Sequence, residues 1–188
     1  MAKIGLNNFR YGVLTEAADG TPTYGGPLTP GKAVSCSVNI TNNDAKLFAD
    51  DALAESDTSF SNGTITMEVD NTDITTMANL LGHTATTGTN PQMTRSANDV
   101  APYVGLGRVV TLMVNGDYKY KVEFLYKVKF SEPSQENTTK GESVEFSTTS
   151  IEGVVAALGN GNWSVTSTFD TKEAAISYLE SLLGTASA

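Results

Sequence analysis

The chain has 188 residues, which is enough for one domain with its own hydrophobic core but not for two of ordinary size. Its 21 acidic and 12 basic residues give a formal net charge of −9, which argues against binding to the outside of a nucleic acid or to an anionic membrane surface. A single cysteine, Cys36, and a single histidine, His83, exclude an internal disulfide and the usual multi-cysteine or multi-histidine metal sites. Ser, Thr and Asn account for 55 residues, a composition typical of β-strands joined by turns.

The chain contains no apolar run long enough for a signal peptide or a membrane-spanning helix, so we expect a soluble protein made in a cytoplasm. Residues 1–32 are rich in Gly, Pro, Thr and Asn, which disfavours a central strand. This segment is therefore predicted to be an extended N-terminal arm. Residues 33–188 are expected to form a single β domain.

The first part of this domain shows the alternation of a half-buried sheet. Residues 33–40 alternate between apolar and polar side chains, which predicts a strand with one exposed face. Residues 44–57 are acidic and fit either a short strand or a helical turn. Residues 63–69 alternate again and predict a second strand.

A helix is expected to begin after Thr72 or Asp73, because either residue is a good N-cap, and to continue to Leu81. Gly82 then fits a left-handed C-cap. The following segment, 83–102, consists largely of Thr, Asn, Gly, Pro and Gln and is predicted to be a long loop. Loops of that length inside a compact domain are uncommon and are usually functional or disordered.

Residues 104–130 predict a long β-hairpin, because Asn115-Gly116 is a favoured pair for a type I′ turn. A two-residue turn at this position places Arg108 opposite Glu123, and the pairing of opposite charges supports the register. From Tyr118 to Phe130 an apolar side chain occupies every second position, which predicts one continuous apolar face.

The other face of this return strand carries four of the lysines together with apolar residues of both strands. Such a mixed face suits an interface in which lysine stems pack and the amines meet carboxylates of another copy. A strand kept soluble by lysine is the alternative interpretation. The inter-subunit candidates are Val110, Leu112, Val114, Lys119, Lys121, Leu125, Lys127 and Lys129.

The C-terminal part predicts two more strands, one at 143–149 and one marked by Trp163, Val165 and Phe169. A helix is expected over 170–183, because Asp170 and Glu173 form an acidic capping box before an apolar stripe.

Several patterns resemble functional motifs but lack the spacing that those motifs require. The acidic residues of 44–57 lack the spacing and the central Gly of a calcium loop, and Gly105-Leu106-Gly107 leads into a strand where a dinucleotide site needs a helix. Cys36 lies on the apolar side of its strand, as an inert thiol does, and His83 follows a helix end, where it can act as a cap. We therefore expect no catalytic residue, no metal site and no cofactor.

The order of these features resembles one family, the major tail tube proteins of long-tailed bacteriophages with flexible, non-contractile tails (siphoviruses). The resemblance extends over essentially the whole chain and includes no catalytic motif. It rests on Lys3-Ile4-Gly5-Leu6-Asn7-Asn8, on Lys46-Leu47-Phe48-Ala49-Asp50-Asp51, on residues 63–69 with the helix ending Leu80-Leu81-Gly82, on the Tyr- and Lys-rich hairpin strand, and on Thr171-Lys-Glu-Ala-Ala-Ile-Ser-Tyr-Leu179.

The resemblance implies a mainly β protein with flanking α, a β-sandwich or partial barrel with a helix after the third strand region and a C-terminal helix. It implies a structural virion protein that forms hexameric rings, which stack into the tail tube through which DNA passes during infection. The protein would occupy the virion tail, and the host cytoplasm during assembly. Other copies of the chain and the tail terminator, tape measure and distal tail proteins are the implied partners, without specific DNA binding and without a membrane. Because the chain ends at Ala188, we expect no C-terminal immunoglobulin-like domain.

A tube that lets DNA slide should have a polar, acidic-to-neutral lining. Two of the expected strands have such a face, and their lumen-facing candidates are Thr64, Thr66, Glu68, Asp70, Ser143, Glu145, Ser147 and Thr149. The arm at 1–32 and the loop at 83–102 are expected to bridge subunits within and between rings.

Three other functions remain as alternatives. A tube protein of a contractile tail or a secretion-like apparatus shares the fold class. A carbohydrate-binding β-sandwich would need a patch of exposed aromatic residues, but Trp163 and most tyrosines occupy strand positions expected to face the core. The third alternative is an enzyme built on a β scaffold, which no residue pattern in the sequence supports.

Overall fold

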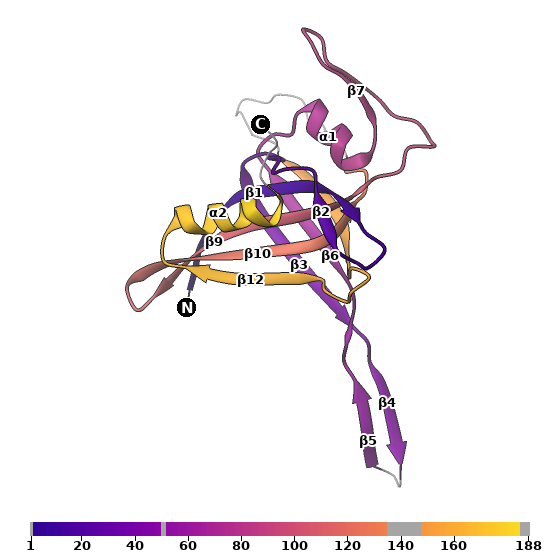
Figure 1. Ribbon diagram of the computed structural model, residues 1–188, viewed down its shortest axis with the longest axis vertical. Coiled ribbons are helices and arrows are strands. Elements are labelled where there is room, and N and C mark those ends of the chain that lie inside the picture. Colours follow the sequence, from indigo (N-terminus) through magenta and orange to yellow (C-terminus); the bar gives the residue numbers. More distant parts are fainter. Residues whose placement is uncertain (1, 50–51, 135–147, 185–188) are drawn as a thin grey trace, which may run out of the picture.

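The computed structural model describes residues 2–49, 52–134 and 148–184, and it is mainly β with two flanking helices, as the composition predicts (Figure 1). In chain order the elements are β1 Ala2–Glu16, β2 Pro22–Tyr24, β3 Ala33–Asn42, β4 Ala45–Ala49, β5 Ala52–Asp57, β6 Phe60–Val69, α1 Ile74–Leu81, β7 Thr84–Thr86, β8 Gln92–Thr94, β9 Tyr103–Val114, β10 Asp117–Phe130, β11 Thr149–Ala156, β12 Ser164–Phe169 and α2 Lys172–Leu182.

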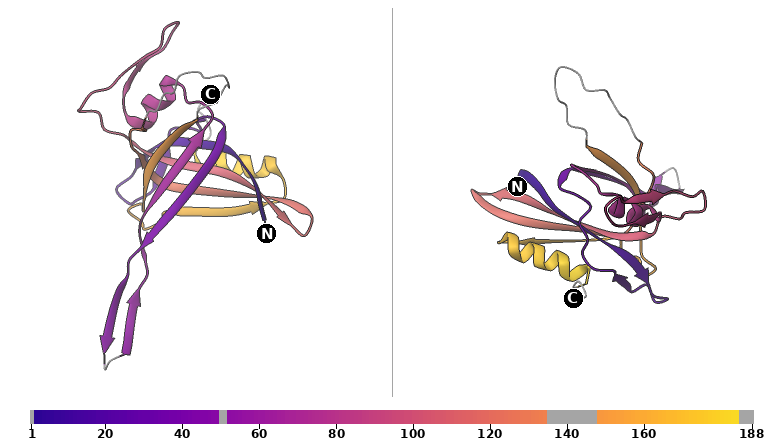
Figure 2. Two further views of the ribbon diagram at one scale, coloured as in Figure 1. Left: turned by 180° about the vertical axis from the view of Figure 1, so that it is seen from behind. Right: turned by 90° about the horizontal axis from the view of Figure 1, so that it is seen from above.

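Strand β10 is the branch point of the main sheet, which has the order β2-β1-β9-β10-β11-β6-β3 and is antiparallel throughout. Residues 120–125 of β10 pair with β12, whereas residues 127–130 pair with β11. The branch β11-β6-β3 crosses over the sheet formed by β1, β9 and β10, as the rear view in Figure 2 shows. The result is a sandwich in which β3 comes near β1 without pairing with it in the described part of the chain.

The long hairpin has the register predicted from its turn. Asn115 and Gly116 have φ values of 53° and 96°, as a type I′ turn requires, and Met113 faces Tyr118. Arg108 faces Glu123, so the charge pair that supported the register is confirmed.

The apolar side chains of β10 do not share one face, and that prediction is wrong. A β-bulge lies between Leu125 and Val128 in the pairing of β10 with β9. An extra residue in a strand reverses which side the following residues face. Phe124 therefore packs in the cluster beneath α2, whereas Val128 packs in the main core on the other side.

The main core lies between the two layers of the sandwich and includes the N-terminal segment. Phe9 and Tyr11 of β1 are each only 1% exposed, and β1 pairs with β9 along most of its length. Residues 1–32 therefore do not form a separate arm. The turn-forming composition of this region comes mainly from residues 18–31, while Phe9, Tyr11 and Val13 alternate as in any central strand.

Helix α1 closes one end of the sandwich and has the predicted bounds. Asp73 is its N-cap and accepts the backbone N–H of Thr76 at 2.6 Å, and Gly82 ends it with a φ of 76°. Leu80 and Leu81 are buried in the main core. The predicted loop at 83–102 is not without structure, because β7 and β8 form a short hairpin within it.

Helix α2 covers the outer face of β9 and β10. Leu179 of the helix and Leu183, its C-cap, are fully buried against this face. Gly107 makes the close approach possible, because a Cβ at this position would overlap the side chain of Leu179. The N-cap of α2 is Thr171, which accepts the backbone N–H of Ala174 at 3.3 Å, rather than Asp170 as the capping-box interpretation had it.

Within the acidic segment, β4 and β5 pair as a hairpin that projects far from the body of the molecule (Figures 1 and 2). The acidic segment is thus a strand pair and not a helical turn. Of the strand predicted at 143–149, residues 143–147 lie outside the described residues, and Thr149 is the first residue of β11. The last predicted strand is present as β12.

Candidate functional site

The outer face of β3, β6 and β11 is a continuous polar surface, which we call the polar sheet face. The register places the side chains in cross-strand rows, such as Ser37, Thr66 and Glu152. The inward side chains of the same strands, such as Ile65, Met67 and Ile151, belong to the main core. The polar sheet face consists of Ser35, Ser37, Asn39, Thr64, Thr66, Glu68, Ser150, Glu152 and Val154.

The polar sheet face carries hydroxyl groups and carboxylates but no basic side chain, because none of its three strands contains Lys or Arg. Glu68 accepts hydrogen bonds from the hydroxyl groups of Thr148 and, at 2.8 Å, Ser35. These bonds lower the pKa of the Glu68 carboxyl, so it is ionised at neutral pH. A shallow hollow of about 240 Å³ lies beside Thr64, Thr66 and Glu152.

The five lumen-facing candidates within the described residues divide into three groups. Thr64, Thr66 and Glu68 lie together on the polar sheet face. Asp70 follows β6 and accepts the backbone N–H of Lys32 at 2.8 Å. The prediction for Thr149 is wrong: it lies opposite Val69, whose side chain faces the core. Its neighbour Ser150, which lies opposite Glu68, is on the polar sheet face instead.

The remaining three candidates, Ser143, Glu145 and Ser147, lie outside the described residues. Sequence reasoning missed the contributions of β3 and β11, including Ser35 and Glu152. Alternation in 33–40 did identify one exposed face. It did not indicate which other strands would continue that face, because strand order depends on long-range pairing.

The predicted mixed lysine face is largely buried within the chain, so its apolar residues do not form the inter-subunit interface that we expected. Val110, Leu112 and Leu125 are each at most 6% exposed, so they are not available to another copy. Val114, at the end of β9, is half-buried. The alternation had not revealed that this face of β9 and β10 is covered by the second layer.

The four lysines of β10 likewise have partners within the chain. Lys119 pairs with Asp170, and Lys121 pairs with Glu123. Lys127 binds Glu16 with its Nζ 2.6 Å from Oε2 and lies over the ring of Tyr103. Lys129 lies over the same ring, with its Nζ 5.3 Å from the centroid. Intramolecular partners thus replace the inter-subunit carboxylates that we expected for these side chains.

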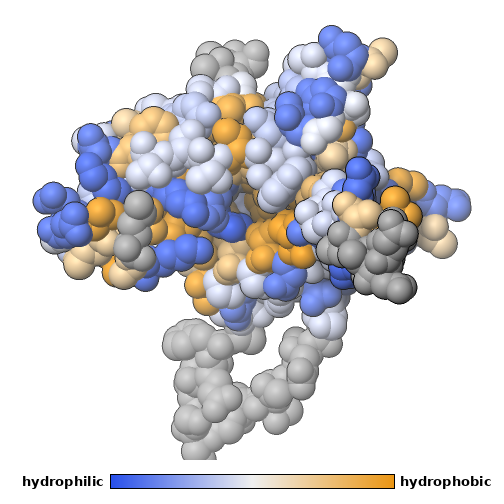
Figure 3. Space-filling model, turned by 90° about the horizontal axis from the view of Figure 1, so that it is seen from below, coloured by the Kyte–Doolittle hydropathy of each residue, from blue (hydrophilic) through white to orange (hydrophobic). Residues whose placement is uncertain are grey.

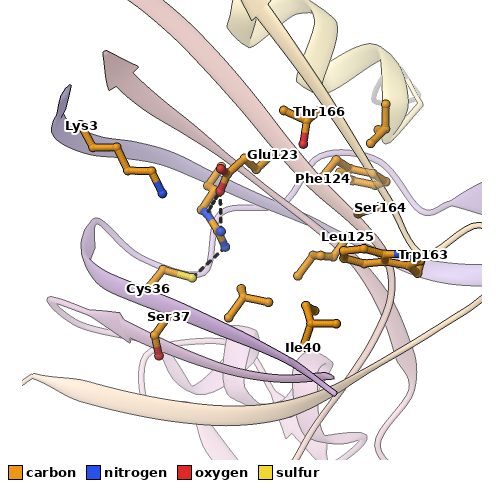
Figure 4. Close-up of a pocket in the computed structure, with 13 residues that line it drawn as sticks. Lys3, Cys36, Ser37, Ile40, Glu123, Phe124, Leu125, Trp163, Ser164 and Thr166 are labelled. Carbon is orange, nitrogen blue, oxygen red and sulfur yellow. Dashed lines mark hydrogen bonds and ion pairs between the residues drawn. The ribbon is translucent and has the colours of Figure 1, made fainter. Parts of the chain in front are cut away.

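Where the two layers of the sandwich diverge, an open cleft of about 470 Å³ lies between β3 and β12. Figure 4 shows its two ends: Lys3, Cys36 and Glu123 lie at one, and Ile40, Leu125 and Trp163 lie at the other. Strands β3 and β12 each pair on one side only within the described ranges, so their outer backbone groups face this opening or solvent. Unpaired strand edges are the usual sites of association with another strand.

Cys36 is held in this cleft as a thiol. Arg108 donates a hydrogen bond from Nη1 to its Sγ at 3.0 Å. Burial raises the pKa of the Cys36 thiol, and the nearby Arg108 charge offsets this only in part. A thiol with a raised pKa is a poor nucleophile.

Trp163 lies at the apolar end of the cleft, but its ring is already stacked. It lies parallel to Phe60, with the ring centroids 4.7 Å apart and an interplanar angle of 3°. A sugar-binding site would need free aromatic faces, and the Tyr103 ring is covered by lysines as well. The arrangement therefore gives no support to the carbohydrate-binding alternative.

The described side chains of the β4–β5 hairpin are exposed. Leu47 on β4 is 59% exposed, although it is apolar. Seen from the side on which this hairpin projects, apolar residues gather near the centre of the molecule and hydrophilic residues flank them (Figure 3). An extended hairpin with little contact to its own domain gains stability when it packs on another surface.

No protein-family model matches the chain, and no curated protein matches its sequence significantly. Within the residues that the structure covers, no helix has the length and hydrophobicity needed to cross a membrane. The same residues contain no group of three or more His, Cys, Asp or Glu side chains that could hold a metal ion. The fold defines a mainly β sandwich with two flanking helices.

Proposed function

We propose that this chain is a structural virion protein of the tail tube type, which forms hexameric rings that stack into a conduit for DNA. The observation that carries the proposal is the polar sheet face, which combines hydroxyl groups and carboxylates without a basic residue. It is bounded by the edge of β3 that has no strand partner among the described residues. In this proposal the polar sheet face lines the lumen of the tube. The proposal includes no catalytic step and no cofactor.

The chemistry of the face suits a surface along which DNA slides. Phosphate groups bind to proteins mainly through Lys, Arg and oriented N–H groups. Glu68 and Glu152 instead place negative charges on the face, and these repel phosphate. Thr and Ser hydroxyl groups hydrogen-bond to water in place of the passing polymer, so no contact holds the DNA.

The open strand edges supply the means of association. A neighbouring copy that pairs with the outer edge of β3 extends the sheet and removes the exposed backbone groups. Repetition of one such heterologous contact closes a ring, and its inner strands then form a barrel. Tail terminator, tape measure and distal tail proteins are the further partners that such a tube requires.

The β4–β5 hairpin takes the bridging role that we had expected of residues 1–32. Residues 2–16 belong to the sheet of their own domain, whereas the hairpin projects beyond it (Figure 1). Exposed Leu47 is then buried against a copy in the adjacent ring. The segment 83–102, with its small β7–β8 hairpin, is a second bridging element in this proposal.

Electron microscopy of the purified protein over a range of concentrations tests this proposal. We expect tubes made of stacked rings. A protein that stays monomeric at every concentration would contradict the proposed function.

Cysteine labelling tests which face lines the lumen. In a Cys36→Ser background, Thr64→Cys places a thiol on the polar sheet face and Glu173→Cys places one on α2. A bulky maleimide should label both variants as monomers. In assembled tubes it should label only the α2 position, and equal labelling would exclude the proposed lumen.

A further inference from the structure

The only histidine of the chain joins two segments that are far apart in sequence. His83 directly follows the C-cap of α1, and its side chain is 7% exposed. Its Nδ1 lies 2.7 Å from Oδ2 of Asp99, and its Nε2 lies 2.5 Å from Oε1 of Glu132. Asp99 belongs to the segment between β8 and β9, whereas Glu132 follows the end of β10.

This geometry defines the protonation state of the ring. An ionised carboxylate only accepts hydrogen bonds, and a neutral imidazole has one N–H and one bare nitrogen. Both ring nitrogens of His83 face carboxylate oxygens, so both bonds form only when both nitrogens carry a proton. The cationic ring is therefore the form that satisfies the two contacts.

Other groups around the ring complete the cluster. Arg95, which directly follows β8, donates from Nε to Oε1 of Glu132 at 3.2 Å, and Asp99 also accepts the backbone N–H of Ser96 at 2.8 Å. These groups line a hollow of about 450 Å³ beside Phe130. Within the described ranges, Arg95, Asp99 and Glu132 are the charged side chains that line it with His83. With the ring charged, the two cations balance the two anions.

We propose that protonated His83 locks segment 84–102 onto the end of β10 and that loss of the ring proton releases this segment. Segment 84–102 projects from one end of the molecule as the β7–β8 hairpin and its flanks, beside α1 (Figure 1). Deprotonation would break one of the two hydrogen bonds and leave the cluster with an excess negative charge beside a shielded ring. The lock is thus a pH-sensitive device built into the fold, and it operates in the isolated chain.

The pKa shifts define the range in which the lock is closed. The hydrogen bond with Asp99 raises the pKa of His83 above its usual 6.5 despite partial desolvation, and Glu132 adds to this effect. The contribution is fully present below pH 6.5 and is lost as the pH rises through the raised value. The hydrogen bond with His83 lowers the pKa of Asp99 below 3.8, so on the acid side the contact between His83 and Asp99 is lost only as the pH falls through that lowered value.

Nitrogen-15 NMR of the imidazole tests the state of the ring, because the sole histidine gives unambiguous signals in a chain without a histidine tag. We expect two protonated nitrogens at pH 6 and a titration midpoint above that of a free histidine. Asp99→Asn keeps an oxygen acceptor but removes the charge, and it should lower the midpoint. Asp117→Asn, an equal charge change at the exposed tip of β10, should leave it unchanged. One bare nitrogen at pH 6, or equal midpoints in wild type and Asp99→Asn, would overturn the proposal.

Release of the segment is measured separately. Hydrogen-exchange protection of amides in 84–102, corrected for intrinsic exchange, should fall by about tenfold when the pH rises above the His83 midpoint. Protection in β9 should not change. At one fixed pH, trypsin should cleave after Arg95 faster in Asp99→Asn than in Asp117→Asn. Protection in 84–102 that is independent of pH, or equal cleavage rates, would also overturn the proposal.

Discussion

Arg108 of β9 and Glu123 of β10 face each other across the sheet and form an ion pair that is 14% and 15% exposed, respectively. Nε of Arg108 lies 2.8 Å from Oε2 of Glu123, and Lys121 binds the other carboxylate oxygen. One carboxylate thus balances two cations inside the sandwich, beside the open cleft.

Replacing this carboxylate by its neutral amide should destabilise the fold. Glu123→Gln keeps the volume but leaves two cations without an anion. Because the pair borders an open cleft, we expect a loss of about 1–2 kcal/mol, less than for a fully buried pair. Urea denaturation measures the change, and Glu55→Gln on the exposed β5 should leave stability nearly unchanged. Equal stability of the two variants would show that the pair contributes nothing.

The same pair predicts a dependence on pH. Burial opposes ionisation of Glu123, but the hydrogen bond from Lys121 and the charge of Arg108 outweigh it and lower the pKa below 4.5. The contribution of the pair is therefore present above pH 4.5 and is lost as the pH falls through the lowered pKa. The difference in unfolding free energy between wild type and Glu123→Gln should be constant from pH 6 to 8 and should shrink in acid. A difference that grows in acid would contradict this assignment.

The register of this pair could be predicted from the sequence because it depends on local turn chemistry. Asn115-Gly116 allows positive φ at both positions, and this fixes which residues of the two strands meet. The bulge after Leu125 could not be predicted, since it arises where β10 changes partner from β12 to β11. Alternation alone therefore assigned the wrong face to the end of the strand.

Gly107 should not tolerate a side chain. A Cβ there would overlap Leu179 and lie 2.9 Å from Phe124, so Gly107→Ala forces the packing of α2 on the sheet to shift. We expect a loss of about 1–3 kcal/mol, measured by urea denaturation. Gly5→Ala on β1 is the control, because its Cβ would meet Thr111 at an ordinary 3.7 Å. The double variant Gly107→Ala with Leu179→Ala should lose less than the sum of the two single changes, and strict additivity would exclude the proposed contact.

The start of α2 distinguishes the structure from the capping box predicted from sequence. Thr171 caps the helix, so Thr171→Ala should cost about 1 kcal/mol of stability. Asp170 pairs with Lys119 at the surface, so Asp170→Asn should have a smaller effect. Thermal unfolding of both variants measures the order. The reverse order would restore Asp170 as the cap.

The polar sheet face could be predicted only in part, because it also depends on which strands pair. Alternation in 63–69 correctly placed Thr64, Thr66 and Glu68 on one side of a strand. Membership of β3 and β11 in the same face depends on pairing between strands many residues apart, for which no local signal exists. The prediction of an arm at 1–32 was also wrong. It relied on the Gly- and Pro-rich stretch that follows β1 and neglected the alternation of Phe9 and Tyr11 within β1 itself.

The β4–β5 hairpin should be removable without loss of the fold, in contrast to β1. Asn43 and Ser59 at its base are already joined, with the backbone N–H of Asn43 donating to the carbonyl of Ser59 at 2.8 Å. Residues 44–58 can therefore be replaced by Asn-Gly, which closes a two-residue hairpin turn. The shortened chain should unfold cooperatively with nearly unchanged stability, since none of the side chains that the structure describes in the removed segment belongs to the main core.

Deletion of residues 2–16 is the contrasting variant and should abolish folding, because it removes Phe9 and Tyr11 from the core.

If the β4–β5 hairpin bridges rings, the chain without it should form single rings or short stacks under conditions in which the full chain forms tubes, as seen by electron microscopy. Tubes of normal length from the shortened chain would contradict the bridging role and leave the lumen assignment untouched, because the polar sheet face remains complete in that variant.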